Sequence, residues 1–173
     1  GLCNLVTLIR LALTASLAAL LVAPAPVAAV EMWHAFGIAV TALLLDGVDG
    51  WAARRAGLAS RFGARFDLEV DSLFALTLAL LAWRTGEAGP WILVLGLPRY
   101  LFLAAGNVWP QLKRELPDRH DRKAVCVLQL GTLVAFLVPV LPPALPVSAA
   151  VLTLVALAWS FLRDVRLLTA PDR

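Results

Sequence analysis

The sequence contains six apolar stretches that are long enough, or nearly long enough, to cross a lipid bilayer. A membrane-spanning helix needs about 20 mostly apolar residues. Hydrophobic residues make up 61% of the 173-residue chain and charged residues 16%, whereas soluble domains are about 45–50% apolar and about 25% charged. These proportions exclude a soluble globular domain and a disordered chain. The apolar stretches predict helices over about residues 5–22, 32–53, 63–83, 90–108, 124–141 and 146–162.

These six helices leave only short loops, so we expect one all-α integral membrane domain over residues 1–173. Positively charged loops stay in the cytoplasm. Arg84 is the only basic residue in three of the five loops. Both termini and the two remaining loops are therefore expected on the cytoplasmic side of a bacterial inner membrane. The net charge of +3 is then explained by basic residues that contact anionic lipid, and no nucleic-acid partner is expected. The basic residues on that side are Arg54, Arg55, Arg61, Arg65, Lys113, Arg114, Arg119, Arg122, Lys123, Arg163, Arg166 and Arg173.

The first apolar stretch has a second interpretation. It is followed by the small-residue segment VAPAPVAA at residues 22–29, which is similar to the cleavage region of a signal peptide. However, Arg10 lies inside the apolar run rather than before it. We therefore expect a retained membrane span.

Four aspartates lie close together in sequence, around the loop between the second and third predicted helices. Asp46 and Asp49 are three residues apart, and Asp67 and Asp71 are four apart, so each pair shares one helix face. Carboxylates inside or near a membrane are costly and usually functional. A short hairpin joins the two helices, so we expect the two carboxylate faces to converge.

Small residues accompany the carboxylates. Gly50 and Ala53 lie on the face of Asp46 and Asp49, and Gly63 lies one turn before Asp67. They leave these faces open to a large group. Glu69 lies about 200° round the helix from Asp67, so it is expected to point away from the cluster, as a solvated or lipid-headgroup residue rather than a ligand.

Converging carboxylates repel one another unless a cation lies between them. Oxygen ligands suit Mg²⁺ or Mn²⁺, and two such ions held by four aspartates can clamp a phosphate under attack. Arg54 is placed to pair with that phosphate. The alternative is that the aspartates simply form ion pairs with nearby arginines of the hairpin, Arg54, Arg55, Arg61 and Arg65.

The spacing of these residues resembles the signature of the CDP-alcohol phosphotransferase family. The matching pattern is Asp46-x-x-Asp49-Gly50-x-x-Ala53-Arg54, eight residues, Gly63, three residues, Asp67, three residues and Asp71. Asn4, Thr7 and Arg10 resemble the family's common first-helix pattern. Lys123 and Gln129 match a looser pattern only in part, because Arg122, Val125 and Cys126 stand where Gly, Lys and Thr are common.

The resemblance implies six helices with a cytoplasmic active site, commonly in a homodimer. It also implies a reaction in which an acceptor hydroxyl attacks the phosphate nearest the alcohol of a CDP-alcohol, here CDP-diacylglycerol, and releases CMP. Asp46, Asp49 and Asp67 would hold two Mg²⁺ or Mn²⁺ ions, and Asp71 would be the general base and share a metal. The nucleotide-binding residues implied by the resemblance are Asn4, Thr7, Asp49, Gly50, Ala53, Arg54 and Gly63.

Arg99 is the main indication of the acceptor. It lies within the fourth apolar stretch, where an unpaired charge is costly, and with Arg119, Arg122 and Lys123 it suits an acceptor that carries phosphate. We therefore predict glycerol 3-phosphate, and inositol phosphate next. Asn107 stands where a glycerophosphate enzyme is expected to have a second arginine, which keeps serine and phosphatidylglycerol as alternatives. Alternatively, Arg99 only pairs with a cluster aspartate or reaches the headgroups.

Two other classes of membrane protein use carboxylates in this way. An Asp-rich prenyltransferase binds diphosphate through Mg²⁺, but it would place its motifs on well-separated helices. A divalent-metal transporter would need carboxylates near the bilayer midplane, whereas these are expected near one face. Metal-dependent release of CMP distinguishes the transferase from both.

Overall fold

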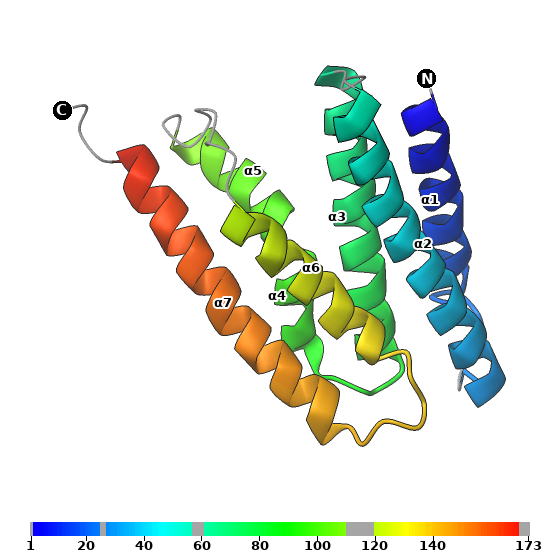
Figure 1. The fold of residues 1–173 in the computed structure, drawn as a ribbon. Coiled ribbons are helices and arrows are strands. Elements are labelled where there is room, and N and C mark those ends of the chain that lie inside the picture. The colour runs from blue at the N-terminus through cyan, green and yellow to red at the C-terminus, as the bar shows by residue number, and fades with distance from the viewer. Residues whose placement is uncertain (1, 25–26, 57–60, 110–119, 170–173) are drawn as a thin grey trace.

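The computed structural model describes the backbone of residues 2–24, 27–56, 61–109 and 120–169, and the side chains of residues 5–24, 27–47, 63, 65–109 and 124–166. All secondary structure in these ranges is helical, which confirms the predicted all-helical fold for them. The elements are α1 (Leu2–Ala19), α2 (Ala29–Ala56), α3 (Arg61–Arg84), the 3-10 turn η1 (Pro90–Ile92), α4 (Leu93–Gly96), α5 (Pro98–Val108), α6 (His120–Ala135) and α7 (Ala144–Thr169) (Figure 1).

The helix α1 packs against both α2 and α3, α4 packs against α3 and α7, and α6 packs against α2, α3 and α7. Buried alanines repeat along one face of α2, at Ala35, Ala39 and Ala42. A matching series on α3 consists of Ala75, Ala79 and Ala82. Small side chains let helices approach closely. Asp46 follows Ala42 by one turn and Asp71 precedes Ala75 by one turn, so both carboxylates continue these buried faces.

The fourth predicted helix is not continuous in the structure. Residues 90–96 and Pro98–Val108 form two pieces that meet at an angle of 72°. Pro98 has no backbone N–H and cannot continue the hydrogen bonds of the preceding turn. The Leu95 carbonyl at the break accepts a hydrogen bond from the buried side chain of Gln129 on α6.

Gly96 explains how closely the first piece approaches α3. A methyl group at this position would lie 2.9 Å from Cβ of Ala79 and 2.9 Å from Cα of Leu76. Only glycine fits this contact without a shift of the α3 backbone. The bend and the close approach together place the start of α5 beside the carboxylate end of α3.

Among the residues that the structure describes, two helices are long and apolar enough to cross a membrane, over Ala29–Gly47 and Ala144–Arg166. The bent pair makes a third if it crosses as one span. The apolar helical segments Leu5–Ala19 and Ala124–Ala135 are shorter. The apolar part of α3 is also shortened, because Asp67, Glu69 and Asp71 lie in its first half. The helices are those of a membrane protein, while six spans and their orientation stay predictions.

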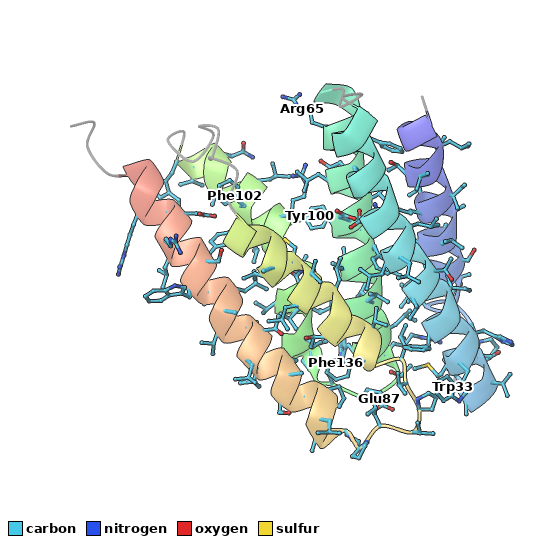
Figure 2. The ribbon with its side chains drawn as sticks, viewed as in Figure 1. Trp33, Arg65, Glu87, Tyr100, Phe102 and Phe136 are labelled. Carbon is cyan, nitrogen blue, oxygen red and sulfur yellow. The ribbon has the colours of Figure 1, made fainter. Side chains whose placement is uncertain are left out.

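The two ends of the helix bundle carry different residues. The start of α1 and the end of α7 lie at the same end (Figure 1). Arg65 is also at that end, whereas Trp33 and Glu87 are at the opposite one (Figure 2). At that opposite end Arg84 donates hydrogen bonds to the carbonyls of Leu20 and Ala23, which fixes the end of α1 to α3.

Candidate active site

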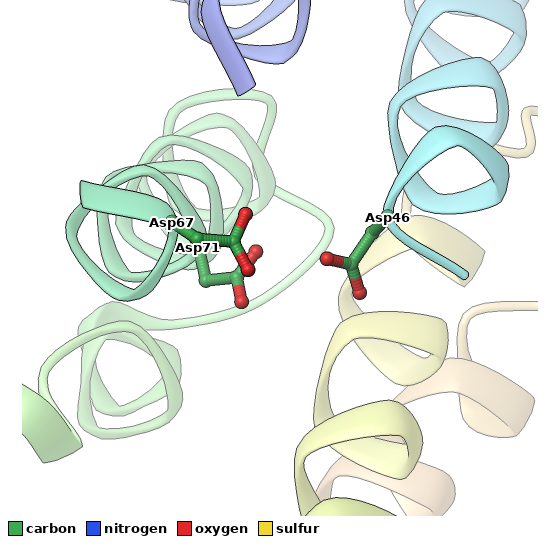
Figure 3. Close-up of side chains that lie close together, drawn as sticks. All are labelled: Asp46, Asp67 and Asp71. Atoms are coloured by element: carbon green, nitrogen blue, oxygen red, sulfur yellow. The ribbon is translucent and has the colours of Figure 1, made fainter. Parts of the chain in front are cut away.

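Three of the four predicted metal-binding aspartates have described side chains, and these three lie together. Asp46 on α2 faces Asp67 and Asp71 on α3 (Figure 3). One carboxylate oxygen from each lies within 4.8 Å of the others. All three are half-buried. The predicted convergence is therefore present for these residues, and the side chain of Asp49 lies outside the described residues.

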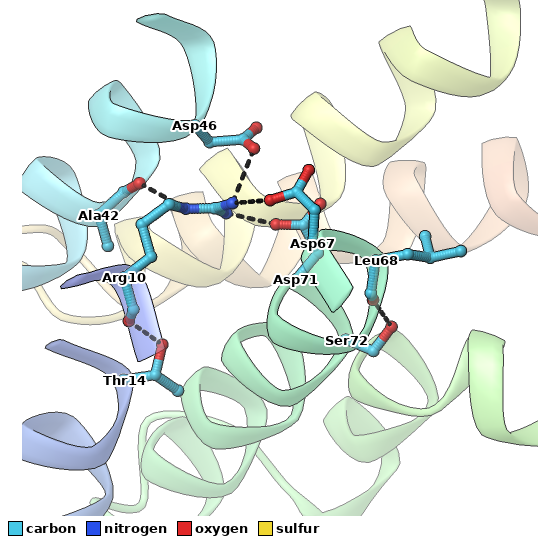
Figure 4. Close-up of polar contacts among 8 residues, drawn as sticks. All are labelled: Arg10, Thr14, Ala42, Asp46, Asp67, Leu68, Asp71 and Ser72. Atoms are coloured by element: carbon cyan, nitrogen blue, oxygen red, sulfur yellow. Dashed lines mark hydrogen bonds and ion pairs between the residues drawn. The ribbon is translucent and has the colours of Figure 1, made fainter. Parts of the chain in front are cut away.

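Arg10 on α1 connects the three carboxylates (Figure 4). Its Nη1 lies 2.9 Å from Oδ1 of Asp46 and 2.7 Å from Oδ1 of Asp67. Its Nη2 donates to Oδ1 of Asp71, and its Nε donates to the Ala42 carbonyl at 3.2 Å. The site is thus built by three helices, and α1 packs against both of the others.

The sequence of α1 explains why Arg10 reaches inward. Thr7, Arg10, Thr14 and Leu17 repeat at helical spacing and are all buried. Arg10 is only 1% exposed. A buried arginine stays charged and is costly unless it is paired, so these carboxylates are its compensating partners.

The carboxylates were expected to pair with hairpin arginines if they had a purely structural role. The partner that the structure shows is Arg10, more than thirty residues away in sequence, while the side chains of Arg54, Arg55 and Arg61 lie outside the described residues. Sequence reasoning assigned Arg10 only to the family's first-helix pattern. The available signal was a single charge inside an apolar helix, which calls for an opposite charge nearby.

The donor set fits a hard divalent cation. Three converging carboxylates provide the oxygen ligands that Mg²⁺ and Mn²⁺ prefer. Arg10 offsets only one of their three negative charges. The Asp46, Asp67 and Asp71 cluster could therefore bind a metal.

A pocket of about 140 Å³ lies next to the cluster, between α3, the bend before α5 and α6. Asp71 belongs both to the carboxylate cluster and to this pocket. Arg99 and Gln129 lie on its other walls. Ser72 also lines it, but its hydroxyl donates to the Leu68 carbonyl at 2.7 Å. The pocket thus places a carboxylate and a guanidinium around one small volume.

Arg99 pairs with Glu69 on α3. This corrects two expectations: Glu69 lies outside the aspartate cluster but forms an ion pair, and the carboxylate that pairs with Arg99 is not one of the cluster aspartates. The Nε atom of Arg99 is buried and has no hydrogen-bond partner among the described residues. Arg99 therefore has one buried donor that its pairing with Glu69 does not satisfy.

The remaining predicted site residues are only partly described. Thr7 is buried on α1, one turn before Arg10, and Gly63 is half-buried near the start of α3. The side chains that fall outside the described residues are those of Asn4, Asp49, Ala53, Arg54, Arg119, Arg122 and Lys123, and Gly50 falls there as well.

Comparison with known proteins gives a consistent result. The family model described as CDP-alcohol phosphatidyltransferase matches residues 1–162. Three mycobacterial proteins described as "Putative cardiolipin synthase", one from Mycobacterium bovis and two from strains of Mycobacterium tuberculosis, are each 33% identical over 166 residues. Each match covers 92% of this chain and 72% of the relative. The chain belongs to the CDP-alcohol phosphatidyltransferase family.

Proposed function

We propose that this protein transfers the phosphatidyl group of CDP-diacylglycerol to glycerol 3-phosphate and releases CMP, as a step of phospholipid synthesis. Membership of the family supports phosphatidyl transfer from a CDP-alcohol. The observation that carries the proposal is the position of Asp71, which joins the metal-binding cluster to a small pocket containing Arg99.

The cluster would act on the diphosphate of the donor. Asp46, Asp49, Asp67 and Asp71 are proposed to hold two Mg²⁺ or Mn²⁺ ions. Bound metal would neutralise the charge that builds up on the phosphates and on the departing CMP. The protein's own part is positional, because the buried alanine faces of α2 and α3 fix where the carboxylates stand.

Asp71 is the proposed general base. The acceptor hydroxyl oxygen forms a bond to the phosphorus nearest the diacylglycerol, and the bond from that phosphorus to the oxygen of CMP breaks. The hydroxyl proton passes to the carboxylate of Asp71. A base must lie within hydrogen-bond reach of the proton that it removes, and Asp71 lines the pocket in which we place the acceptor.

The nucleotide is proposed to lie on the hairpin side of the cluster. Asn4, Thr7, Asp49, Gly50, Ala53, Arg54 and Gly63 are the residues that we assign to it. Glycine and alanine at this end of α2 and α3 leave room for the cytidine, and Arg54 suits its phosphates. The acyl chains would remain in the bilayer.

Arg99 is proposed to bind the phosphate of the acceptor. Guanidinium groups bind phosphate through paired hydrogen bonds, and the unpartnered Nε supports this role. The acceptor phosphate would take the place of the Glu69 carboxylate. Arg119, Arg122 and Lys123 are proposed as further basic contacts at the same membrane face.

Phosphatidylglycerol is a second candidate acceptor. It presents the same glycerol phosphate group on a lipid, and the mycobacterial relatives described as cardiolipin synthases favour it. A groove of about 410 Å³, lined only by apolar residues of α4, α5 and α7, lies beside Pro98 and would suit acyl chains. Inositol phosphate and serine remain weaker alternatives.

The protein is proposed to work as a homodimer of six-span subunits in a bacterial inner membrane, with the cluster facing the cytoplasm. The start of α1, the end of α7 and Arg65 all lie at one end of the bundle, and this supports the orientation. Native mass spectrometry from nanodiscs should give twice the subunit mass. A single-subunit mass under these mild conditions would contradict the dimer.

The acceptor is tested with purified protein, Mg²⁺ and CDP-diacylglycerol labelled in the phosphatidyl group. Glycerol 3-phosphate should receive the label, and Arg99→Ala should raise the KM for it with a smaller effect on kcat. Arg166→Ala is the control, because Arg166 is an exposed arginine of α7 outside this pocket. Labelled cardiolipin from phosphatidylglycerol alone would favour the second candidate. Transfer only to serine would overturn both.

A further inference from the structure

Arg10 is the only charged residue of α1, and it is used entirely inside the protein. All three nitrogens of its guanidinium have partners: Nη1 contacts Asp46 and Asp67, Nη2 contacts Asp71, and Nε contacts the Ala42 carbonyl. Each of the three aspartates thus shares an ion pair with this one arginine. Its position is therefore determined by the same carboxylates that fit a metal.

The charges of these four described side chains do not cancel one another. Arginine remains protonated in proteins, so the three carboxylates and Arg10 together carry two negative charges when all are ionised. Three carboxylates this close would repel one another without a cation. Arg10 reduces that repulsion while the site contains no metal.

A divalent ion would be attracted to oxygens that Arg10 already contacts. The distances of 2.7 and 2.9 Å from Nη1 to Asp67 and Asp46 mean that an ion on these carboxylates would lie only a few ångströms from a positive charge. At an effective dielectric constant of about 20, a unit charge about 5 Å away changes a divalent ion's affinity by more than tenfold.

We propose that Arg10 is the built-in counter-cation of the carboxylate cluster. It holds Asp46, Asp67 and Asp71 together before a metal binds, and it weakens the affinity with which they then hold that metal. This inference does not depend on which CDP-alcohol or acceptor the protein uses.

The test measures Mn²⁺ binding by electron paramagnetic resonance, and thermal unfolding in chelator and in saturating Mn²⁺. Arg10→Met removes the charge but keeps an unbranched side chain. Arg84→Met is the matched control, since Arg84 contacts the backbone carbonyls of Leu20 and Ala23 at the other end of α1. Arg10→Lys keeps the charge but cannot bridge three carboxylates.

Arg10→Met should bind Mn²⁺ about tenfold more tightly or better, unfold at a lower temperature in chelator, and recover more than the wild type when Mn²⁺ is added. Arg84→Met should lose the same stability in chelator and in Mn²⁺, with wild-type affinity. Arg10→Lys should lose stability in chelator but bind Mn²⁺ within about threefold of the wild type.

Equal or weaker Mn²⁺ binding by folded Arg10→Met would overturn the proposal, because Arg10 would then only orient the ligands. If Arg10→Met does not fold in chelator, Arg10→Gln is measured in its place, since glutamine can still donate to the Ala42 carbonyl. Folding of either neutral variant in Mn²⁺ alone supports the proposal. Failure of both to fold even in Mn²⁺ contradicts it, because a metal should replace the missing charge.

Discussion

Arg99 on α5 forms an ion pair with Glu69 on α3, and the same arginine lines the pocket that contains Asp71. Glu69 is 53% exposed in this pair. Ion pairs exposed to this degree contribute only about 0–1 kcal/mol to stability. The fold therefore does not require the pair, and Arg99 can exchange the carboxylate for another anion.

Glu69→Gln tests this exchange. Removing the carboxylate should lower the KM for a phosphate-bearing acceptor, because the phosphate no longer displaces or faces a negative charge. Stability should change by less than about 1 kcal/mol. Initial rates at several acceptor concentrations, with a thermal melt, provide both readouts. A KM that increases several-fold would mean that Glu69 holds Arg99 in its binding position.

Asp71→Asn should reduce kcat by about 10²–10⁴-fold, the usual contribution of a general base, while the CDP-alcohol still binds. Turnover and equilibrium binding of the donor are measured on the same preparation. Glu87→Gln at the opposite end of the bundle is the control and should leave kcat unchanged (Figure 2). Near-wild-type turnover of Asp71→Asn would remove the base assignment.

Gly96→Ala should destabilise the protein by about 1–3 kcal/mol, because the added methyl meets the backbone of α3. Gly131→Ala is the matched control, since a methyl there has nothing within 4 Å. Thermal unfolding in one detergent should show a lower Tm only for the first variant. Equal melting of both would mean that the close approach of α4 to α3 is not rigid.

The carboxylate pairs could be predicted from the sequence because helical spacing alone places Asp67 and Asp71 on one face. Hydropathy likewise predicted helices throughout. How Asp46 meets them was not predictable, because the predicted route was a direct pairing of α2 with α3. In the structure α1 packs against both and provides Arg10 between them.

The bend before α5 and the partner of Arg99 were also missed. Pro98 is a local signal for a break, but a hydropathy average over 90–108 does not register it and cannot give an angle. The pairing of Arg99 with Glu69 depends on that angle, because the bend determines which face of α3 the start of α5 approaches. Long-range packing, rather than local propensity, decided both features.

Release of CMP from CDP-diacylglycerol tests the central claim most directly. Wild-type protein in nanodiscs should release CMP only when an acceptor and Mg²⁺ or Mn²⁺ are both present. Chelation should abolish the release and added metal should restore it, while Asp67→Asn should stay inactive. Release that persists in chelator, or in Asp67→Asn at the wild-type rate, would contradict phosphatidyl transfer at this cluster.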